Sequence, residues 1–512
     1  MSKNKYFALL GAVAVAVTLG SAASASTSLS YDSTGIITST DTLTVNSLGD
    51  SGDKLAYCKI VDIIYDKAKD SISYAFTSEF QTYLSGVSDT SPLHGLTIKD
   101  YQAITDAGTS SGAQVTGDKR IDKIAGAIAA GFDNCTNMTV SGTTATANVP
   151  FGAYVIKPVS RDDAIMSKVY GVIIANINVK EENGAYIEDP ASPKTFDAKA
   201  SDRGAIAKTI DGGDDTYELG QEITYKLTAT VPLYPSNATN KKIAVTDTLE
   251  SGLTFGSYGT VKVANGAKTY TIVSNEIKDE NSTKVGEVRV DSDGQTRTYV
   301  FYDALAVGQK IEITYTASLN GNATLGDVTG NANNNGSTAK LLVVKNPYDT
   351  SEAWEESAPS TKEVYTYGLK VQKRDAANQD LGLQGAEFDL CRTKSNPCLE
   401  NDRITHITMD DSDVILDKTV ATLAAKTYYL VETKAPAGYV LPSGETAITT
   451  FTVTKGEQTK DPYSAIVTVL NTKTNFNLPF TGGRGVIIYA IIGVGIVGVA
   501  SIYYYRKKKN EA

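Results

Sequence analysis

Two histidines and four cysteines are the residues of this chain whose types most often bind metals or act as nucleophiles. The histidines, His94 and His406, leave little room for a zinc site or for a histidine-based hydrolase triad. An even number of cysteines suits disulfide bonds if the chain is exported to an oxidising compartment. The sequence therefore argues against an enzyme and against a metal or other cofactor, and the chemistry of the cysteines depends on location.

The first 25 residues have the organisation of a secretory signal peptide. Lys3 and Lys5 precede an apolar run from Tyr6 to Leu19, and the segment ends in the small residues Ala23-Ser24-Ala25. The alternative, an N-terminal membrane anchor, is disfavoured because the run is too short to span a bilayer. We therefore expect a secreted chain from which residues 1–25 are removed.

Export makes disulfide bonds the expected state of the cysteines. Pairing within a single domain is favoured, so the expected bonds join Cys58 to Cys135 and Cys391 to Cys398. Free buried thiols are the alternative.

The C-terminal end has the pattern of a membrane anchor. Gly485 to Tyr505 is a stretch of 21 uncharged residues, long enough to cross a bilayer of about 30 Å as a helix. Four basic residues, Arg506 to Lys509, follow it, and the positive-inside rule places residues 506–512 in the cytoplasm. The bulk of the mature chain is therefore expected outside the cell.

The composition between these ends favours several β domains. The 512 residues predict about three domains, and 29 tyrosines against one tryptophan, with abundant Thr, Ser, Val and Ile, favour strands over helical bundles. Residues 1–25 and 482–512 together carry a net charge of +6, so the chain between them stands at −16. Because phosphate recognition needs a basic surface, we expect no nucleic acid partner.

Residues 26–195 are predicted to form a mixed first domain. Its strongest helical pattern runs from Lys59 to Leu84, where apolar residues recur near helical spacing. These apolar residues are Ile60, Ile63, Ile64, Ala68, Ile72, Ala75, Phe76 and Phe80.

Residues 196–350 and 363–475 are predicted to be two β-sandwich domains. In the first of them, Gln221–Val231 and Lys310–Leu319 alternate apolar with polar residues, as half-buried strands do. Joints rich in Gly, Asn and Asp separate the strands, and two packed sheets are the natural arrangement. The expected architecture is thus mostly β: a mixed N-terminal domain and two sandwiches in a linear array, followed by a C-terminal transmembrane helix.

A short motif precedes the predicted membrane span. Leu478-Pro479-Phe480-Thr481-Gly482, followed by the apolar span and the basic tail, resembles the LPxTG cell-wall sorting signal of Gram-positive surface proteins. The resemblance implies that a sortase cysteine attacks the Thr481 carbonyl, releases Gly482 onward and passes the acyl group to an amine. A plain single-span protein is the alternative.

The third region contains the twelve residues YYLVETKAPAGY, from Tyr428 to Tyr439. They resemble the E-box of Gram-positive pilins and CnaB-type adhesin domains. Leu369–Asp375, Leu383–Phe388 and Val467–Asn471 resemble that family's first strand, the turn after it and its last strand. The resemblance implies Ig-like, CnaB-type sandwiches in which a Lys, a Glu and an Asn build an intramolecular isopeptide bond.

In this third region we assign Lys373 as nucleophile, Glu432 as acid/base and Asn471 as electrophile. Burial disfavours charge, so it should lower the pKa of the amine and raise that of the carboxyl. Protonated Glu432 is then expected to donate to the Asn471 carboxamide oxygen and to move protons as ammonia leaves. Family spacing excludes Lys370, which alternation puts on the opposite strand face. In the alternative, Glu432 bonds backbone and Lys373 is a solvated strand-edge charge.

The second region carries a matching set. Ala207–Ile210, Leu219–Tyr225 and Val245–Phe255 resemble the D2 domain of isopeptide-forming fimbrial proteins. The resemblance implies that Lys208 is the nucleophile and Asp247 the buried acid. Four asparagines near residue 330 are candidate acceptors, and the family pattern favours Asn335, then Asn333. A turn-forming cluster of asparagines is the alternative.

A shaft pilin also needs an exposed lysine that accepts Thr481 of another subunit. The family has it in a V-x-V-Y-P-K-N pattern at the junction of the first two domains. Ala175–Glu181 occupies that junction but lacks the Tyr-Pro pair, which makes Lys180 the first candidate. Lys345 matches the letters V-K-N but lies one domain later, and ordinary surface charge is the alternative for both lysines.

Together these resemblances imply a wall-anchored structural protein, the major subunit of a covalent pilus (fimbrial) shaft. The expected partners are sortases, identical subunits and peptidoglycan. The alternative is a monomeric wall-anchored adhesin, or a tip or base pilin, that binds a host surface molecule.

Overall fold

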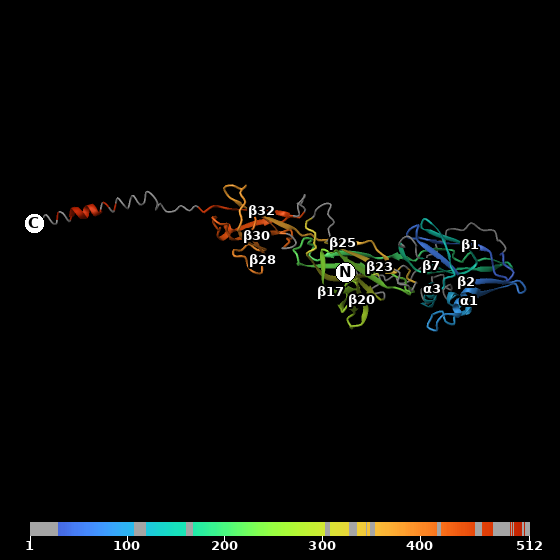
Figure 1. Ribbon diagram of the computed structural model, residues 1–512. Helices are drawn as coiled ribbons and strands as arrows, with labels where there is room; N and C mark the ends of the chain where they lie inside the picture. The colour runs from blue at the N-terminus through green and yellow to red at the C-terminus, as the bar shows by residue number, and fades with distance from the viewer. Residues whose placement is uncertain are drawn as a thin grey trace, which may run out of the picture. The chain divides into compact units, whose positions relative to one another are not determined.

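The computed structural model describes residues 29–106, 119–159, 167–302, 308–326, 335–344, 346–348, 354–416, 421–455 and 463–474, with scattered residues between 492 and 506 (Figure 1). The chain divides into two compact units, Met1–Thr324 with Ala332–Tyr365, and Leu325–Asn331 with Thr366–Ala512. The predicted signal peptide and sorting motif lie outside the described residues, as does most of the predicted span. Within the described part of the chain, no helix is both long and apolar enough to cross a membrane.

The first unit begins with a part that mixes helices and strands. Its elements are β1 (Thr40–Asn46), β2 (Lys54–Asp66), β3 (Ser71–Phe76), α1 (Ser78–Ser85), α2 (Ile98–Asp106), α3 (Lys119–Gly131), β4 (Thr136–Asn137), β5 (Thr139–Ser141), β6 (Thr144–Pro150), β7 (Gly152–Val159), β8 (Lys168–Tyr170), β9 (Ile173–Ile177), β10 (Val179–Glu182), β11 (Ala185–Glu188), β12 (Thr195–Asp197) and β13 (Ala200–Asp202). Because β12 pairs with β1 and β13 with β8, this part continues past residue 195 to Asp202.

Two sheets and three helices form the layers of this first part. The sheet β3-β2-β7-β9 lies between the sheet β12-β1-β6-β5 and the helices, and α1 and α3 lie beside β2 and β7 in Figure 1. One core, which includes Phe80, Ile128 and Val155, joins the helices to the central sheet. A second core, which includes Leu43 and Tyr154, lies between the two sheets.

The helix predicted over Lys59–Leu84 is wrong. The segment forms most of β2, all of β3 and all of α1 except its last residue. Its Ile and Val residues are β-branched and pack well on a pleated sheet, and the turn between Asp66 and Ser71 separates two paired strands. The apolar residues matched helical spacing because Ile60, Ile63 and Ile64 lie three and four positions apart, although they belong to a strand.

The second part of the first unit is all β. Its strands are β14 (Ala205–Ile210), β15 (Glu222–Thr230), β16 (Ile243–Leu249), β17 (Leu253–Val263), β18 (Lys268–Val273), β19 (Glu276–Lys278), β20 (Lys284–Val290), β21 (Thr296–Phe301), β22 (Lys310–Leu319), β23 (Gly336–Val344), β24 (Trp354–Glu356) and β25 (Ser360–Glu363). The predicted strands Gln221–Val231 and Lys310–Leu319 are confirmed as β15 and β22.

These strands form one continuous sheet that folds over on itself, where two separate sheets were expected. They pair in the order β14-β15-β22-β17-β18-β19-β20-β21-β16-β23-β24, with β25 on β23. Inward side chains of β14, β15 and β22 meet those of β16 and β23 in one core. Strands β18 to β20 carry the hydrogen bonding from one layer to the other.

The second unit contains two small sheets. Its elements are β26 (Gly368–Asp375), β27 (Glu387–Cys391), β28 (Arg403–Thr408), β29 (Asp413–Leu416), β30 (Thr427–Lys434), the 3-10 helix η1 (Gly444–Ala447), β31 (Ile448–Thr452) and β32 (Tyr463–Asn471). One sheet has the order β29-β26-β32 and the other β28-β27-β30-β31. The first and last strands, β26 and β32, pair in parallel, so Asp375 is opposite Asn471.

Candidate functional site

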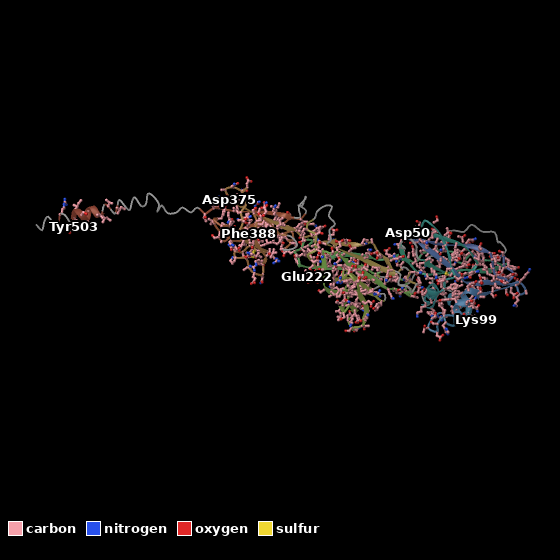
Figure 2. All side chains as sticks on the ribbon, in the orientation of Figure 1. Asp50, Lys99, Glu222, Asp375, Phe388 and Tyr503 are labelled. Carbon is pink, nitrogen blue, oxygen red and sulfur yellow. A yellow bond between two sulfur atoms is a disulfide. The ribbon has the colours of Figure 1, made fainter. Side chains whose placement is uncertain are left out.

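The second unit brings Lys373, Glu432 and Asn471 together in its interior. Lys373 on β26 and Asn471 on β32 come from one sheet, and Glu432 on β30 comes from the other. Their exposed fractions are 0%, 2% and 4% for Lys373, Asn471 and Glu432. Phe388, labelled in Figure 2, presents its ring 5.6 Å from the Lys373 Nζ. The three side chains assigned to bond formation are therefore enclosed between the two sheets.

Hydrogen bonds connect the three side chains. The Lys373 Nζ donates to the Asn471 Oδ1, lies 3.4 Å from the Glu432 Oε2 and donates to the Val469 carbonyl at 3.4 Å. The Asn471 Nδ2 donates to the Glu432 Oε1 at 2.7 Å and to the Val440 carbonyl at 3.1 Å. The amine thus lies against the carboxamide, and the carboxyl contacts both.

One contact differs from the expected one. Glu432 was expected to donate to the carboxamide oxygen of Asn471, whereas it accepts from the carboxamide nitrogen. The oxygen is occupied by the Lys373 amine, which reaches the carboxamide from its other side. In this arrangement the acid is next to the nitrogen that must leave as ammonia when a bond forms, so it is placed to protonate that nitrogen.

Burial shifts both pKa values in the direction that the chemistry needs. Burial lowers the pKa of Lys373, although the neighbouring Glu432 opposes the shift, and burial raises the pKa of Glu432 against the influence of Lys373. A neutral amine and a neutral carboxylic acid are thereby favoured. Lys370, by contrast, points out of the sheet and pairs with Asp413 at 3.5 Å, which confirms that it lies on the opposite face from Lys373.

The first unit holds a second buried lysine and carboxylate. Lys208 on β14 is 2% exposed and Asp247 on β16 is 4% exposed, and the Lys208 Nζ donates to the Asp247 Oδ1. The amine also donates to the Tyr315 hydroxyl at 2.7 Å and lies 4.5 Å from the centre of the Tyr225 ring. Burial lowers the pKa of Lys208 to about 8, and the charge of Asp247 opposes the shift.

Asn335 is buried at the start of β23. Its Oδ1 accepts from the Thr324 N–H at 3.0 Å, and its Nδ2 donates to the Thr324 carbonyl at 2.8 Å. Two residues later Ser337, on the same face of the strand, lies 3.4 Å from the Asp247 Oδ1. Asn335 thus directly precedes the strand that carries Ser337 to the cluster, and its carboxamide is hydrogen bonded to the Thr324 backbone. Asn331, Asn333 and Asn334 lie outside the described residues.

Sequence reasoning missed two polar members of this cluster. The Tyr315 hydroxyl contacts the Lys208 amine, and the Ser337 hydroxyl lies 3.1 Å from the Tyr315 hydroxyl. Tyr315 belonged to the alternating pattern of its strand and was counted as apolar core. Ser337 lies two positions after Asn335, and period-two alternation would have placed it beside the cluster.

Lys180 lies at the far end of the first part, away from the part that follows. Strand β7 reaches the second part at Pro158, whose carbonyl accepts from the Asn346 Nδ2 at 3.2 Å. Strand β9 runs antiparallel to β7, so Ile177 at its end pairs with Gly152, the first residue of β7. The expected position of Lys180 at the junction of the two parts is therefore wrong. The chain runs the length of this sheet, about 25 Å, away from the second part before it reaches Lys180.

Lys180 is presented on a short hairpin. Strands β10 and β11 are joined by Asn183 and Gly184, both at positive φ, which is the geometry of a tight hairpin turn. Lys180 faces the same way as its partner Ile187, and its side chain is 38% exposed and 2.9 Å from the Glu182 carboxylate. On the other face of the hairpin, Tyr186 packs on Tyr65. Lys345 lies outside the described residues.

The cysteines and histidines take structural positions. Disulfides join Cys58 to Cys135 and Cys391 to Cys398. His406 is half-exposed on β28, with its Nδ1 2.8 Å from the Asp389 Oδ1, and His94 lies 3.4 Å from Asp89. Each histidine thus pairs with a carboxylate, an exposed one at Asp89 and a largely buried one at Asp389.

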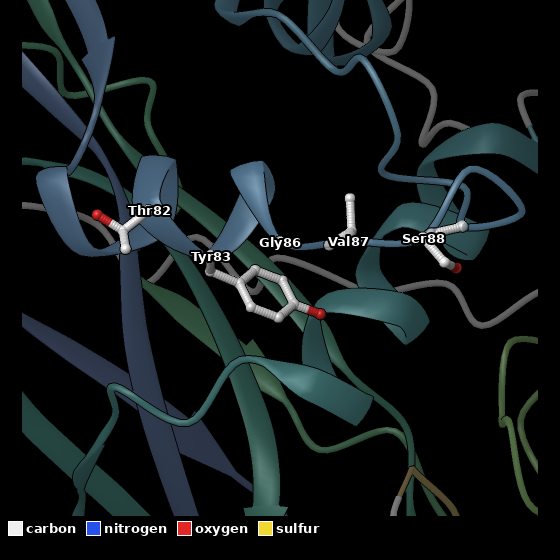
Figure 3. Close-up of a pocket in the computed structure, with 6 residues that line it drawn as sticks. Thr82, Tyr83, Gly86, Val87 and Ser88 are labelled. Carbon is white, nitrogen blue, oxygen red and sulfur yellow. The ribbon is translucent and has the colours of Figure 1, made fainter.

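A shallow hollow lies beside the C-terminal end of α1 (Figure 3). Its lining residues are Thr82, Tyr83, Gly86, Val87, Ser88 and Ser91. None of these six residues ionises near neutral pH, so they offer no acid/base pair for catalysis.

The chain is similar to proteins of Gram-positive surface fibres. Residues 368–464 match the family of SpaA prealbumin-like fold domains. The sequence is 26% identical over 347 residues to fimbrial subunit type 1 of Actinomyces viscosus, covering 57% of this chain and 62% of that protein. It is 28% identical over 266 residues to the trypsin-resistant surface T6 protein of Streptococcus pyogenes serotype M6, covering 49% of this chain and 46% of that protein.

A solved structure shares the fold. The T6 backbone pilin of Streptococcus pyogenes serotype M6, described as a modular three-domain structure decorated with variable loops and extensions, superposes with a TM-score of 0.55. The match has 24% identity and covers 83% of this chain and 81% of that one. Against the two curated relatives, the chain spans 62% and 46% of their lengths.

Proposed function

We propose that this chain, a relative of the Gram-positive pilins, is the structural shaft subunit of a covalently polymerised surface pilus and is stabilised by internal Lys-Asn isopeptide bonds. The observation that carries the proposal is the enclosed contact of Lys373, Glu432 and Asn471, from strands 59 and 98 residues apart in sequence. Such a set has no role in binding a ligand from solution, because it is buried. It suits one reaction of the chain with itself.

The proposed reaction joins β26 to β32. The neutral Lys373 amine attacks the Asn471 carboxamide carbon, and the bond from that carbon to Nδ2 breaks. Protonated Glu432 gives its proton to the departing nitrogen, which leaves as ammonia, and takes one proton from the attacking amine, so the acid is restored. One amide and one ammonia replace one amine and one carboxamide, so atoms balance without a cofactor. Lys208 and Asn335, with Asp247 as acid, are proposed to react in the same way in the first unit.

The position of Lys180 supports its proposed role as acceptor of the next subunit. Within the first unit, the end of β23 at Val344 is close to the first part, where Arg203 donates to the Val344 carbonyl at 3.3 Å. The other end, Gly336, pairs with Glu363, two residues before the chain leaves this unit. Lys180 and this exit are therefore at opposite ends of the first unit.

Export, processing by sortase and anchoring to peptidoglycan are proposed from the sequence. The signal pattern, the motif from Leu478 to Gly482, the apolar span and the basic tail follow the order that this processing requires. A precursor held in the membrane would present Thr481 outside the cell, where a sortase can transfer it to a subunit or to the wall.

Intact mass tests the internal bonds. The mature chain should be lighter than its sequence mass by two ammonia equivalents, about 34 Da after disulfides are counted, since each bond releases one ammonia. Glu432→Ala and Asp247→Ala should each restore one equivalent, and Lys370→Ala, the outward-facing control, should restore none. A wild-type mass equal to the sequence mass would remove the mechanism.

Immunoblots of cell-wall extracts test the shaft role. The wild-type chain should give a ladder of covalent multimers, and Lys180→Arg, which keeps the charge but removes the primary amine, should abolish the ladder while the mass deficit stays. A ladder lost only in Lys345→Arg would move the role to that residue. If wild-type cells show wall-linked monomers alone, the protein is the alternative, a monomeric adhesin or a tip or base pilin.

A further inference from the structure

The buried carboxylate of Asp375 joins three separated segments of the second unit. Asp375, labelled in Figure 2, ends β26 and is 2% exposed. Its Oδ1 accepts from the backbone N–H groups of Ala377 and Asn378 at 2.7 and 3.1 Å. Its Oδ2 accepts from the Tyr439 hydroxyl at 2.7 Å and lies 3.5 Å from the Lys473 Nζ. One side chain thus holds a turn, the end of the E-box and the chain after β32.

Backbone hydrogen bonds continue this contact. The Val440 N–H donates to the Thr472 carbonyl at 3.0 Å, and the Thr474 N–H donates to the Gly438 carbonyl at 2.9 Å. Between them Tyr439 and Lys473 form an antiparallel bridge. We call Gly438–Val440 the E-box tail and Thr472–Thr474 the docked segment. The docked segment is therefore an added short strand on the E-box tail, beyond the end of the sheet strand β32.

The docked segment ends close to the predicted sorting motif. Three residues, 475–477, separate Thr474 from Leu478. If the chain were free from Asn471 onward, Leu478 could move up to about 25 Å from the domain, whereas with Thr474 fixed its reach falls to about 14 Å. Fixing the docked segment therefore limits where a sortase can meet the motif.

We propose that Asp375 and Tyr439 are positioning residues for the sortase reaction at Thr481, because they fix the docked segment and hold the motif near one face of the second unit. This rests on the proposed function. Neither residue touches the reacting carbonyl; each acts by restricting the tether that leads to it. The hydrogen bond from Tyr439 also lowers the pKa of Asp375, as expected for a carboxylate that acts as an acceptor in its charged form.

The E-box tail makes a second contact, and this contact makes a control necessary. The Val440 carbonyl accepts from the Asn471 Nδ2 at 3.1 Å, so a change at Tyr439 could act through the isopeptide site. Intact mass separates the two effects, because it reports the Lys373 to Asn471 bond directly. Tyr429→Phe removes a hydroxyl from the same E-box on β30, and it serves as the matched variant.

The test compares full-length Tyr439→Phe, Asp375→Asn and Tyr429→Phe chains in the producing cells. In the first two we expect hydrogen exchange at the Val440 and Thr474 amides to rise at least tenfold, the two-ammonia mass deficit to remain, and the multimer ladder to shorten several-fold. Tyr429→Phe should match the wild type in all three readouts.

Unchanged hydrogen exchange would overturn the proposal, because it means that Asp375 and Tyr439 do not fix the docked segment. Raised exchange with an unchanged ladder would overturn it too. So would a mass deficit that is smaller by one ammonia equivalent, since that places Tyr439 in bond formation. A wild-type chain that forms no ladder would contradict the proposed shaft function instead, and the exchange measurement would still decide whether the segment is docked.

Discussion

At the scale of single residues, Lys373 and Lys208 differ in what lies against the amine. The Lys373 amine contacts both the Asn471 carboxamide and Glu432, so the proposed nucleophile, electrophile and acid are already together. The Lys208 amine contacts Asp247 and Tyr315, while Asn335 is hydrogen bonded to the Thr324 backbone. The two sites share a buried lysine and a carboxyl group but hold the carboxamide differently.

A pH dependence follows from the lowered pKa of Lys208. In Asn335→Ala the amine cannot form a bond and remains titratable, with a pKa of about 8 in the folded chain against 10.5 for the ordinary side chain. Between these values the unfolded chain binds more protons, so the free energy of unfolding should rise with pH from 8 to 10.5, by about 3 kcal/mol. Below pH 8 the full penalty of charging a buried amine remains.

Denaturant unfolding followed by tryptophan fluorescence measures this effect. Trp354, the only tryptophan of the chain, lies on β24 in the same unit as Lys208. Wild-type protein is the control, since an amide nitrogen does not titrate and the other groups are shared. If the free energy of unfolding changes with pH in the same way in the wild type and in Asn335→Ala, then either no bond forms in the wild type or Lys208 keeps its ordinary pKa.

The residues of the second-unit site could be predicted because the E-box supplies a fixed spacing around Glu432, and the two flanking strands then identify Lys373 and Asn471. Tyr315 and Ser337 could not be predicted in the same way. Tyr315 reaches Lys208, and Ser337 reaches Tyr315 and Asp247, from strands 107 and 129 residues after Lys208 in the chain. Only the folding of the continuous sheet brings them there. Local pattern predicts which way a side chain points, not which distant side chain it meets.

At the scale of elements, α3 shows a glycine that packing requires. Gly126 lies in the middle of the helix, and a Cβ there would be 2.3 Å from the Asn237 carbonyl oxygen in the loop before β16. Helix propensity alone predicts that alanine would stabilise by about 1 kcal/mol. We expect Gly126→Ala to destabilise the first unit by about 1 to 3 kcal/mol instead, because backbone atoms must move apart.

The sign of this change is the test. Thermal unfolding of the first unit, followed by Trp354 fluorescence, should show a lower midpoint for Gly126→Ala. The comparison of Lys123→Ala with Lys123→Gly, at an exposed position of the same helix, measures the propensity effect alone. A raised midpoint in Gly126→Ala would mean that α3 and the loop at Asn237 do not pack closely.

The strands were easier to predict than the helices. Alternation in β15 and β22 is regular, since each has one face in the core and one outside. The apolar run around Ile60 led to the wrong prediction of a helix because β2 is buried on both faces of the central sheet. Burial on both faces removes the alternation of apolar and polar residues that marks a strand. The helical pattern of α3 is present in the sequence, since Ile124 and Ile128 are four positions apart and both are buried. The smaller Ala and Gly residues around them weaken the contrast between its apolar and polar faces.

At the scale of the whole molecule, the proposed bonds determine which parts of the chain carry tension in a pilus. A force between Lys180 and Thr481 would pass along residues 181–207 to Lys208, cross to Asn335, follow the chain to Lys373 and cross to Asn471. Residues 209–334 and 374–470 would lie outside this path. The segment 181–207 has no crosslink. Besides the β10–β11 hairpin and the start of β14, it is held by the three-residue strands β12 and β13 and by the Arg203 to Glu355 ion pair at 2.5 Å.

We therefore expect the segment 181–207 to extend first when the molecule is pulled between a cysteine handle at position 180 and the C-terminal end. Its 27 residues can lengthen by no more than about 95 Å, whereas Asp247→Ala, without the first-unit bond, should release the 126 residues between Lys208 and Asn335 and add roughly 400 Å. Arg203→Gln should lower the force of the first step without changing its length, because the ion pair resists extension but does not determine the number of residues released. Single-molecule force spectroscopy distinguishes these lengths directly, and a step of several hundred ångströms in the wild type would contradict the bond between Lys208 and Asn335 or the bond between Lys373 and Asn471.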